Sequence, residues 1–266
     1  MKHETSMTIA ERSAFIDNCQ LADCSHSMIE HVSAMNASVP RLLEQPSQAA
    51  VAGGNLLAFA EGVSRQNKED VMDSLLFATL AANKDFNPET RSQDWYGRFN
   101  QALATMGWIS TNWSYSRYRS SHQRFSMEQA GLEILGSAIA AAALPGPASL
   151  AMLKVAADAV EALKAKDKPL RMFERQTKTH KGANFRIGAC MESADGTVNL
   201  AMGAVNFSAD SAVNNVLFWE WNSTDVETFR GEDHLVLNSR IYASVRKRIQ
   251  QRLSKSAESA IDEFDI

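Results

Sequence analysis

The chain has 266 residues, of which 45% are hydrophobic and 22% are charged, and its formal net charge is −4. This composition is typical of a globular protein, and the length suffices for one large core or two small ones. The negative net charge and a pI near 5.9 argue against general affinity for nucleic acid, because such binding needs a concentrated basic surface.

The cysteine content and the N-terminus indicate where the chain folds. Three cysteines, Cys19, Cys24 and Cys190, do not make a disulfide framework. Cys19 and Cys24 would lie on different faces of one helix, so we expect folding in a reducing compartment. The N-terminus lacks the apolar region of a secretory signal, and no run of about 18 apolar residues predicts a transmembrane span. We therefore expect synthesis in the cytoplasm, with any export independent of a conventional signal peptide.

The first half of the chain has helical periodicity. Apolar residues at helical spacing over 8–35 predict an N-terminal helical segment, 1–48. Further helices are expected over 49–62, 68–82 and 94–108, the last of which ends at Gly107. Over 109–118 bulky and small polar residues alternate, which predicts a half-buried strand.

Gly53-Gly54 is the first glycine pair of the chain. It lacks the strand context and the Lys-Ser/Thr pair of a phosphate-binding loop. We therefore interpret it as a kink or a helix boundary.

The most apolar region begins at Ser126, which fits the first position of a capping box. Two helical runs follow, 127–144 and 147–165. Pro145-Gly146-Pro147 stops the first run and restarts the second, since proline is accepted in a first helical turn. These features predict a helical hairpin rich in alanine.

Two interpretations of this hairpin stay open. A hairpin that is buried in the soluble state and exposed at a bilayer is typical of pore-forming toxins, and helices of about 18 residues would reach about 27 Å, close to the hydrocarbon thickness. Charged residues oppose insertion, because each costs roughly 2.5–3.5 kcal/mol at the centre of a spanning helix. They are Glu133, Lys154, Asp158 and Glu161. The alternative, a packed helix pair at the centre of a globular domain, is favoured.

The pattern changes to strands after the charged boundary 164–168. Apolar residues alternate over 185–192 and again over 198–204, and Asp195-Gly196 between them is a hairpin-turn signal. The apolar run 216–221 predicts a third strand, and 235–253 predicts a final helix. Its basic cluster, Arg246-Lys247-Arg248, is interpreted as a solvated helix end that could also touch anionic lipid.

These elements indicate the fold class α+β. We expect a helix-rich single domain with an apolar helical hairpin and a small, mainly antiparallel sheet. The N-terminal helical segment 1–48 precedes an α+β core over 49–253, and a polar tail follows over 254–266.

Cys190 is the candidate functional residue. It lies in a predicted strand beside the small residues Gly188 and Ala189. A catalytic cysteine needs a base to lower its pKa, and His180 and His234 are the candidates. Three interpretations stay open: a buried apolar thiol, a site of lipid attachment or part of an acyl pocket, and a catalytic nucleophile.

No other set of residues predicts chemistry. His26 and His31 are five residues apart rather than four, which does not place two ligands on one helix face. We therefore predict no metal site, no cofactor and no catalytic set.

Four stretches resemble the bacterial virulence-factor family named for the Erwinia virulence factor, Evf. They are Trp95-Tyr96 to Gly107-Trp108, Phe125-Ser126-Met127-Glu128 to Leu135, Phe185 through Cys190, and Leu237-Asn238 to Val245-Arg246. The resemblance covers about 65–253, and its motifs are diffuse, hydrophobic and aromatic. It implies a compact α/β protein without enzymatic machinery, associated with colonisation of an insect host. It also implies a fatty acyl chain on a central cysteine, which here maps to Cys190.

The leading hypothesis is a non-enzymatic, toxin-like bacterial virulence protein that acts at or near membranes and binds lipid or carries an acyl chain. Its expected partners are membrane lipid or a fatty acyl chain, and no nucleic acid. One alternative is a cysteine-dependent acyl transferase or hydrolase that uses Cys190 with His180 or His234. The other is a soluble protein-interaction module. The sequence does not indicate an oligomeric state.

Overall fold

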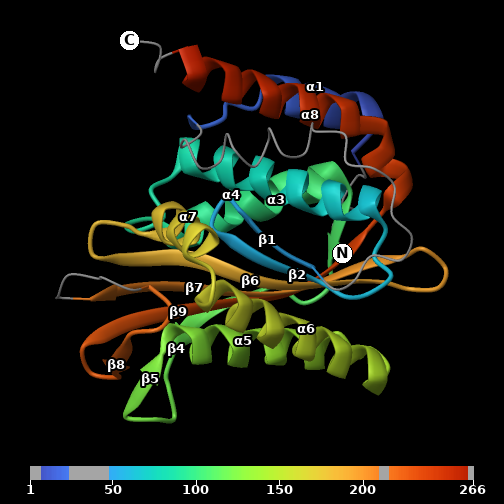
Figure 1. The fold of residues 1–266 in the computed structure, drawn as a ribbon. Coiled ribbons are helices and arrows are strands. Elements are labelled where there is room, and N and C mark those ends of the chain that lie inside the picture. The colour runs from blue at the N-terminus through green and yellow to red at the C-terminus, as the bar shows by residue number, and fades with distance from the viewer. Residues whose placement is uncertain (1–6, 24–47, 210–215, 263–266) are drawn as a thin grey trace, which may run out of the picture.

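The computed structural model describes residues 7–23, 48–209 and 216–262, and it confirms the α+β class. A mixed sheet lies at the centre, with helices on both faces (Figure 1). The helices are α1 (Ile9–Asn18), α3 (Arg65–Asp85), α4 (Ser92–Met106), α5 (Met127–Ala141), α6 (Gly146–Lys164), α7 (Asp167–Thr177) and α8 (Ser239–Asp262). The strands are β1 (Gln48–Ala52), β2 (Asn55–Phe59), β3 (Trp108–Ser110), β4 (Ser114–Tyr118), β5 (Arg124–Ser126), β6 (Gly182–Glu192), β7 (Val198–Ala209), β8 (Glu220–Asn222) and β9 (Val226–Leu237).

The main sheet has seven strands in the order β1-β2-β6-β7-β9-β3, and β4 also pairs with β9. All of these pairs are antiparallel except β2 with β6, which is parallel. β5 and β8 form a separate two-stranded sheet. β1 is therefore an edge strand, and β6 and β7 lie at the centre.

Both faces of the central strands are mostly apolar, although β6 also carries the buried polar residues Asn184 and Arg186. Along β6, Ala183, Phe185, Ile187 and Ala189 pack against α5 and α6, while Cys190 points into the cluster formed with α3, α4 and α8. Figure 1 shows the same division, with α3, α4 and α8 on one side of the sheet and α5 and α6 on the other. A sheet that is hydrophobic on both faces needs a helical layer on each.

Helix α5 packs very closely on β7. A Cβ atom at Gly203 would lie 2.7 Å from the backbone nitrogen of Leu135 and 3.0 Å from the carbonyl oxygen of Gly131. Because these are backbone atoms, they cannot turn aside as a flexible side chain can. The separation of α5 from the sheet thus depends on glycine at position 203.

Much of the sequence-based prediction is confirmed. The helices predicted over 68–82 and 94–108 form as α3 and α4, and Gly107 ends α4 with a φ of 103°. The capping box at Ser126 and the α5–α6 hairpin are both present. The hairpin of β6 and β7 turns at Gly196, whose φ is 81°.

The prediction of a helix over 49–62 is wrong. This segment forms the β1–β2 hairpin, and its turn contains Gly53 and Gly54 with φ values of 59° and 76°. Two successive positive φ values are what a tight two-residue hairpin turn requires. All five residues of β2 are buried, and a strand covered on both faces lacks the alternation that distinguishes it from a buried helix.

Two further differences lie in the second half. In the predicted strand 216–221, Val216 and Leu217 are buried in a turn, and only Glu220–Asn222 forms a strand. The third long strand is instead β9, which includes residues 235–237 of the predicted final helix. Helix α7 begins at Asp167, at the end of the charged boundary, where no helix was predicted.

The helices near the chain ends and one predicted strand also differ from the prediction. The N-terminal helix expected over 8–35 forms over Ile9–Asn18, and 24–47 lies outside the described residues. The predicted strand 109–118 is divided between β3 and β4. Helix α8 continues to Asp262, past the predicted start of a polar tail at 254.

We predict that Gly203→Ala lowers the free energy of unfolding by about 1–3 kcal/mol, since the added methyl group pushes α5 away from β7. Urea denaturation measures this change. Gly136→Ala, which lies on α5 itself, is the control, because a Cβ at Gly136 would meet only Leu153 Cδ2 at 3.6 Å. The control should be neutral or stabilising by roughly 0.5–1 kcal/mol. Equal effects of the two substitutions would contradict this account of the packing.

Candidate functional site

Cys190 is fully buried in β6, where it pairs with Leu200 of β7 and Phe59 of β2. Burial raises the pKa of its thiol, Glu192 raises it further, and Lys68 lowers it. A thiol in such surroundings stays protonated and is a weak nucleophile. The position of Cys190 agrees with one of the three interpretations of this residue, a buried apolar thiol.

The structure does not bring the two candidate histidines to Cys190. His180 precedes β6, and the eight residue-to-residue steps from Gly182 to Cys190 span about 26 Å of strand. His234 lies on β9, where it pairs with Ala201 of β7, and β9 is two strands away from the β6 strand of Cys190. It also shares a sheet face with Ala201, on the α5 side, whereas Cys190 faces α3. His234 instead meets the Thr111 hydroxyl at 3.1 Å, and burial lowers its pKa.

A groove lies on the other side of the sheet from Cys190, between edge strand β1 and helices α6 and α7. This groove has a volume of about 750 Å³. Ten of its thirteen lining residues are apolar, and they include Val51, Leu56, Val155, Ala162 and Met172. Ligand sites in proteins commonly have about 300–1,000 Å³ and a predominantly apolar lining.

The remaining lining residues are polar and lie at the rim. Asp158 is bound by Lys154 at 2.6 Å, so its charge is compensated. Lys166 is exposed and makes no ion pair with any residue in the described ranges. It is also the N-cap of α7 and gives that helix no side-chain cap. A helix N-terminus carries a partial positive charge and free N–H groups, so this end of the groove favours an anion.

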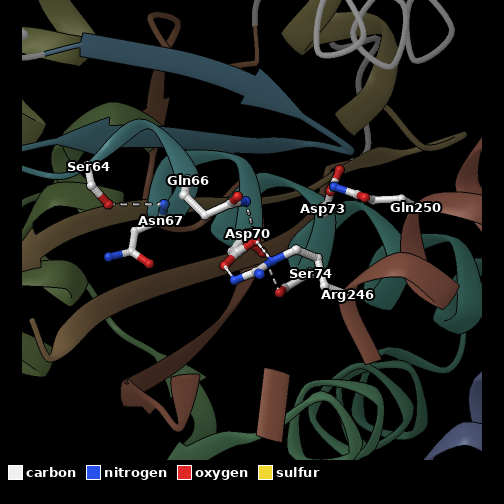
Figure 2. A network of polar contacts seen from close by, with 8 residues as sticks. All are labelled: Ser64, Gln66, Asn67, Asp70, Asp73, Ser74, Arg246 and Gln250. Carbon is white, nitrogen blue, oxygen red and sulfur yellow. Dashed lines mark hydrogen bonds and ion pairs between the residues drawn. The ribbon is translucent and has the colours of Figure 1, made fainter. Parts of the chain in front are cut away.

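A polar network joins α3 to α8 (Figure 2). Arg246 donates to both oxygens of Asp70, at 2.7 and 2.6 Å, and Gln66 donates to Oδ1 of the same carboxylate at 3.0 Å. Asp70 is fully buried. A bidentate arginine–carboxylate pair of this kind fixes both distance and orientation, so it sets how α8 lies on α3.

The network corrects the interpretation of the basic cluster as a solvated helix end. Arg246 binds Asp70, and Arg248 pairs with Asp17 of α1. Beyond the cluster, Arg252 donates to the carbonyl oxygen of Cys19. These cations hold α8 to α3 and to the N-terminal segment. They lie within α8 rather than at its end, because the helix continues to Asp262.

Asp73 is the second carboxylate between α3 and α8, and Figure 2 shows it facing Gln250. The Gln250 amide donates to Asp73 Oδ2 at 3.4 Å. Burial raises the pKa of Asp73 to about 7, with a smaller lowering by Gln250 and a further raising by Asp70. The folded protein therefore binds a proton here that the unfolded chain releases.

No helix described here is long and apolar enough to cross a bilayer. Within the same residues, no group of three or more His, Cys, Asp or Glu side chains is arranged to hold a metal ion.

Comparisons with known proteins give only distant similarities. The sequence matches no family model and no curated protein. Among solved structures, a delta-endotoxin is similar with 13% identity and a TM-score of 0.41, over 76% of this chain and 89% of that chain. The structure of the Evf virulence factor is similar with 14% identity and a TM-score of 0.34, over 81% of this chain and 86% of that one. Neither similarity makes this chain a member of the other protein's family.

The groove residues were not singled out by the sequence pattern. Val51 and Leu56 belong to the segment predicted to be helical, and Met172 belongs to the helix that was not predicted. One signal was present: Val155, Ala159 and Ala162 recur at helical spacing on α6. Such a stripe is the same for a core-facing helix and for a helix that lines a groove.

We predict that Asp73→Asn makes the protein more stable near neutral pH. The pKa of Asp73 is raised in the folded state, so its contribution to stability is present below the ordinary value of 3.8 and is lost as pH rises toward about 7. The amide has no charge to bury, and the expected gain at neutral pH is of the order of 1–3 kcal/mol. Urea unfolding across this pH interval measures it, with Asp158→Asn on the surface as the control. A parallel pH profile for Asp73→Asn and wild type would contradict the prediction.

Proposed function

We propose that this protein acts at or near membranes as a non-enzymatic, toxin-like protein, and that it takes one lipid acyl chain into the groove between β1, α6 and α7. The toxin-like expectation comes from the sequence resemblance to the Evf family. The observation that supports lipid binding is the groove itself, whose volume is about 750 Å³.

The lining of the groove suits an acyl chain. Its apolar walls come from β1, β2, α6 and α7, and none of the described residues that line it is aromatic. Binding of a flexible hydrocarbon is stabilised in proportion to the apolar area that is removed from water, by roughly 25 cal/mol per Å². It requires no hydrogen-bonding partner from the walls.

The rim suits an anionic or zwitterionic headgroup. Lys166 offers a positive charge at the uncapped N-terminus of α7, and the Asp158 charge is held by Lys154. An acyl chain in the groove would place its polar end beside Lys166 or in solvent. This charge arrangement favours a carboxylate or phosphate over a cationic group.

Membrane insertion of the α5–α6 hairpin is not needed for this proposal. The two helices have 15 and 19 residues, and α5 therefore reaches about 22 Å, less than the hydrocarbon thickness. Lipid capture in a groove allows the hairpin to remain packed on the sheet while the protein lies at the membrane surface.

We predict that Ala162→Trp reduces lipid binding by filling the groove, since Ala162 is half-buried in its wall. Binding of a fluorescent fatty acid should weaken at least about ten-fold, and flotation with phosphatidylglycerol vesicles should decrease. Ala157→Trp is the matched control, because Ala157 is exposed on the same helix and does not line the groove. Failure of the wild-type chain to bind any vesicle or fatty acid would overturn the proposal.

Attachment of a fatty acyl chain to Cys190 stays a prediction. The thiol faces α3, on the far side of the sheet from the groove, so a thioester there would require room in the core. Intact mass spectrometry of protein from its native host tests it, with Cys190→Ser as the control. An added mass of one acyl chain that is absent from the variant would make Cys190 the lipid site. An unmodified mass would leave the groove as the lipid site.

A further inference from the structure

Arg186 is a fully buried arginine in β6, with 1% of its surface exposed. Its Nε donates to Asn55 Oδ1 at 2.7 Å, and its Nη2 donates to the carbonyl oxygen of Gly53 at 2.6 Å. The guanidinium carbon lies 4.7 Å from the ring centre of Trp95 and 5.3 Å from that of Phe99. These contacts hold the guanidinium plane in one orientation.

The buried charge of Arg186 has no carboxylate partner in the described part of the chain. Its neutral neighbours include Tyr96, whose hydroxyl donates to Asn184 at 2.6 Å. Burial disfavours the charge and lowers the pKa of Arg186, while Tyr96 raises it. Burial of a cation without a counter-charge is strongly unfavourable. An anion bound beside it would remove much of that cost.

Two buried donors near this point have no hydrogen-bond acceptor among the described residues: Nη1 of Arg186 and Nε2 of Gln176. The Oε1 of Gln176 accepts from the Gly54 backbone at 3.0 Å, which fixes the amide group. A Cβ at Gly54 would lie 3.1 Å from Arg186 Nη2 and 3.2 Å from the carbonyl oxygen of Gln176. The β1–β2 turn therefore packs directly against both residues.

Arg186 and Gln176 line one cavity of about 390 Å³. It lies between the end of α3, the start of α4, the end of α7 and the β1–β2 turn. Lys84 adds positive charge to the lining, Lys178 is paired with Glu174 at 3.9 Å, and the carboxylate of Asp85 is bound by Arg98 at 2.7 Å. Net positive charge and unused donors are the features of an anion site.

We propose that this cavity binds a phosphate-bearing ligand, with Arg186 and Gln176 as the donors to its oxygens. The planar guanidinium suits the oxygens of a phosphate group, and the second positive charge of Lys84 favours a dianion over a single carboxylate. The volume of about 390 Å³ leaves room beside the phosphate for part of the molecule that carries it. The site is independent of the lipid groove, because it lies at the C-terminal end of α7 and the groove lies at the N-terminal end.

Titration of the full chain with inorganic phosphate, by calorimetry and by thermal unfolding, tests the proposal. Phosphate should bind and raise the Tm, and chloride at the same ionic strength should not. Gln176→Glu places a carboxylate beside Arg186, where it takes the place of the ligand. This variant should have a higher Tm without phosphate and at least about ten-fold weaker phosphate binding.

Gln123→Glu is the matched control, since it adds the same charge at an exposed residue and should bind phosphate like the wild type. No phosphate binding by the wild type, or equal binding by Gln176→Glu, would overturn the proposal. If Gln176→Glu fails to fold, the wild-type titration alone tests whether phosphate binds.

Vesicles of phosphatidylcholine with and without phosphatidic acid distinguish a lipid headgroup from a soluble ligand as the source of the phosphate. Flotation with phosphatidic acid that inorganic phosphate inhibits indicates a lipid headgroup, and binding of free phosphate without flotation indicates a soluble ligand.

Discussion

The structure depends on the burial of one sheet on both faces. Strands β6 and β7 are covered along nearly their whole length, with apolar side chains on the α3 side and on the α5 side. Since apolar side chains dominate both faces, α3, α4 and α8 cover one face and α5 and α6 cover the other. The close approach of α5 to Gly203 and the ion pair between Asp70 and Arg246 then set where two of these helices lie. Cys190 is buried in the apolar cluster on the α3 side of this sheet.

Spaces for ligands therefore occur where the layers end. Both the groove and the phosphate cavity adjoin α7, the helix that lies between edge strand β1 and the start of β6. Its N-terminal half meets the groove through Pro169 and Met172, and its last turn meets the cavity through Gln176. The two sites differ in chemistry, because aliphatic walls surround the first and unused hydrogen-bond donors line the second. A single helix thus separates an apolar site from a cationic one.

The sequence predicted the fold class and the elements that have local signals. Ser126 and Gly107 cap helices by interactions within one turn, and Gly196 forms its turn for the same local reason. The β1–β2 hairpin was missed because its second strand is apolar on both faces, which is a consequence of its neighbours. Neither candidate site was predicted. Arg186 and Asn55 are 131 residues apart in the chain, and a buried cation without a counter-charge becomes visible only once the strands are paired.

The central claim is that an acyl chain occupies the groove on the α6 side of the sheet. Methyl NMR of the full chain with a spin-labelled fatty acid tests it most directly, because the label broadens the signals of nearby methyl groups. We expect broadening of Val51, Leu56, Val155 and Met172, which line the groove, and sharp signals for Val245, Ile249 and Leu253 of α8, which lie in the cluster on the α3 side of the sheet. Broadening of the α3 cluster instead, or of no methyl group at all, would contradict it.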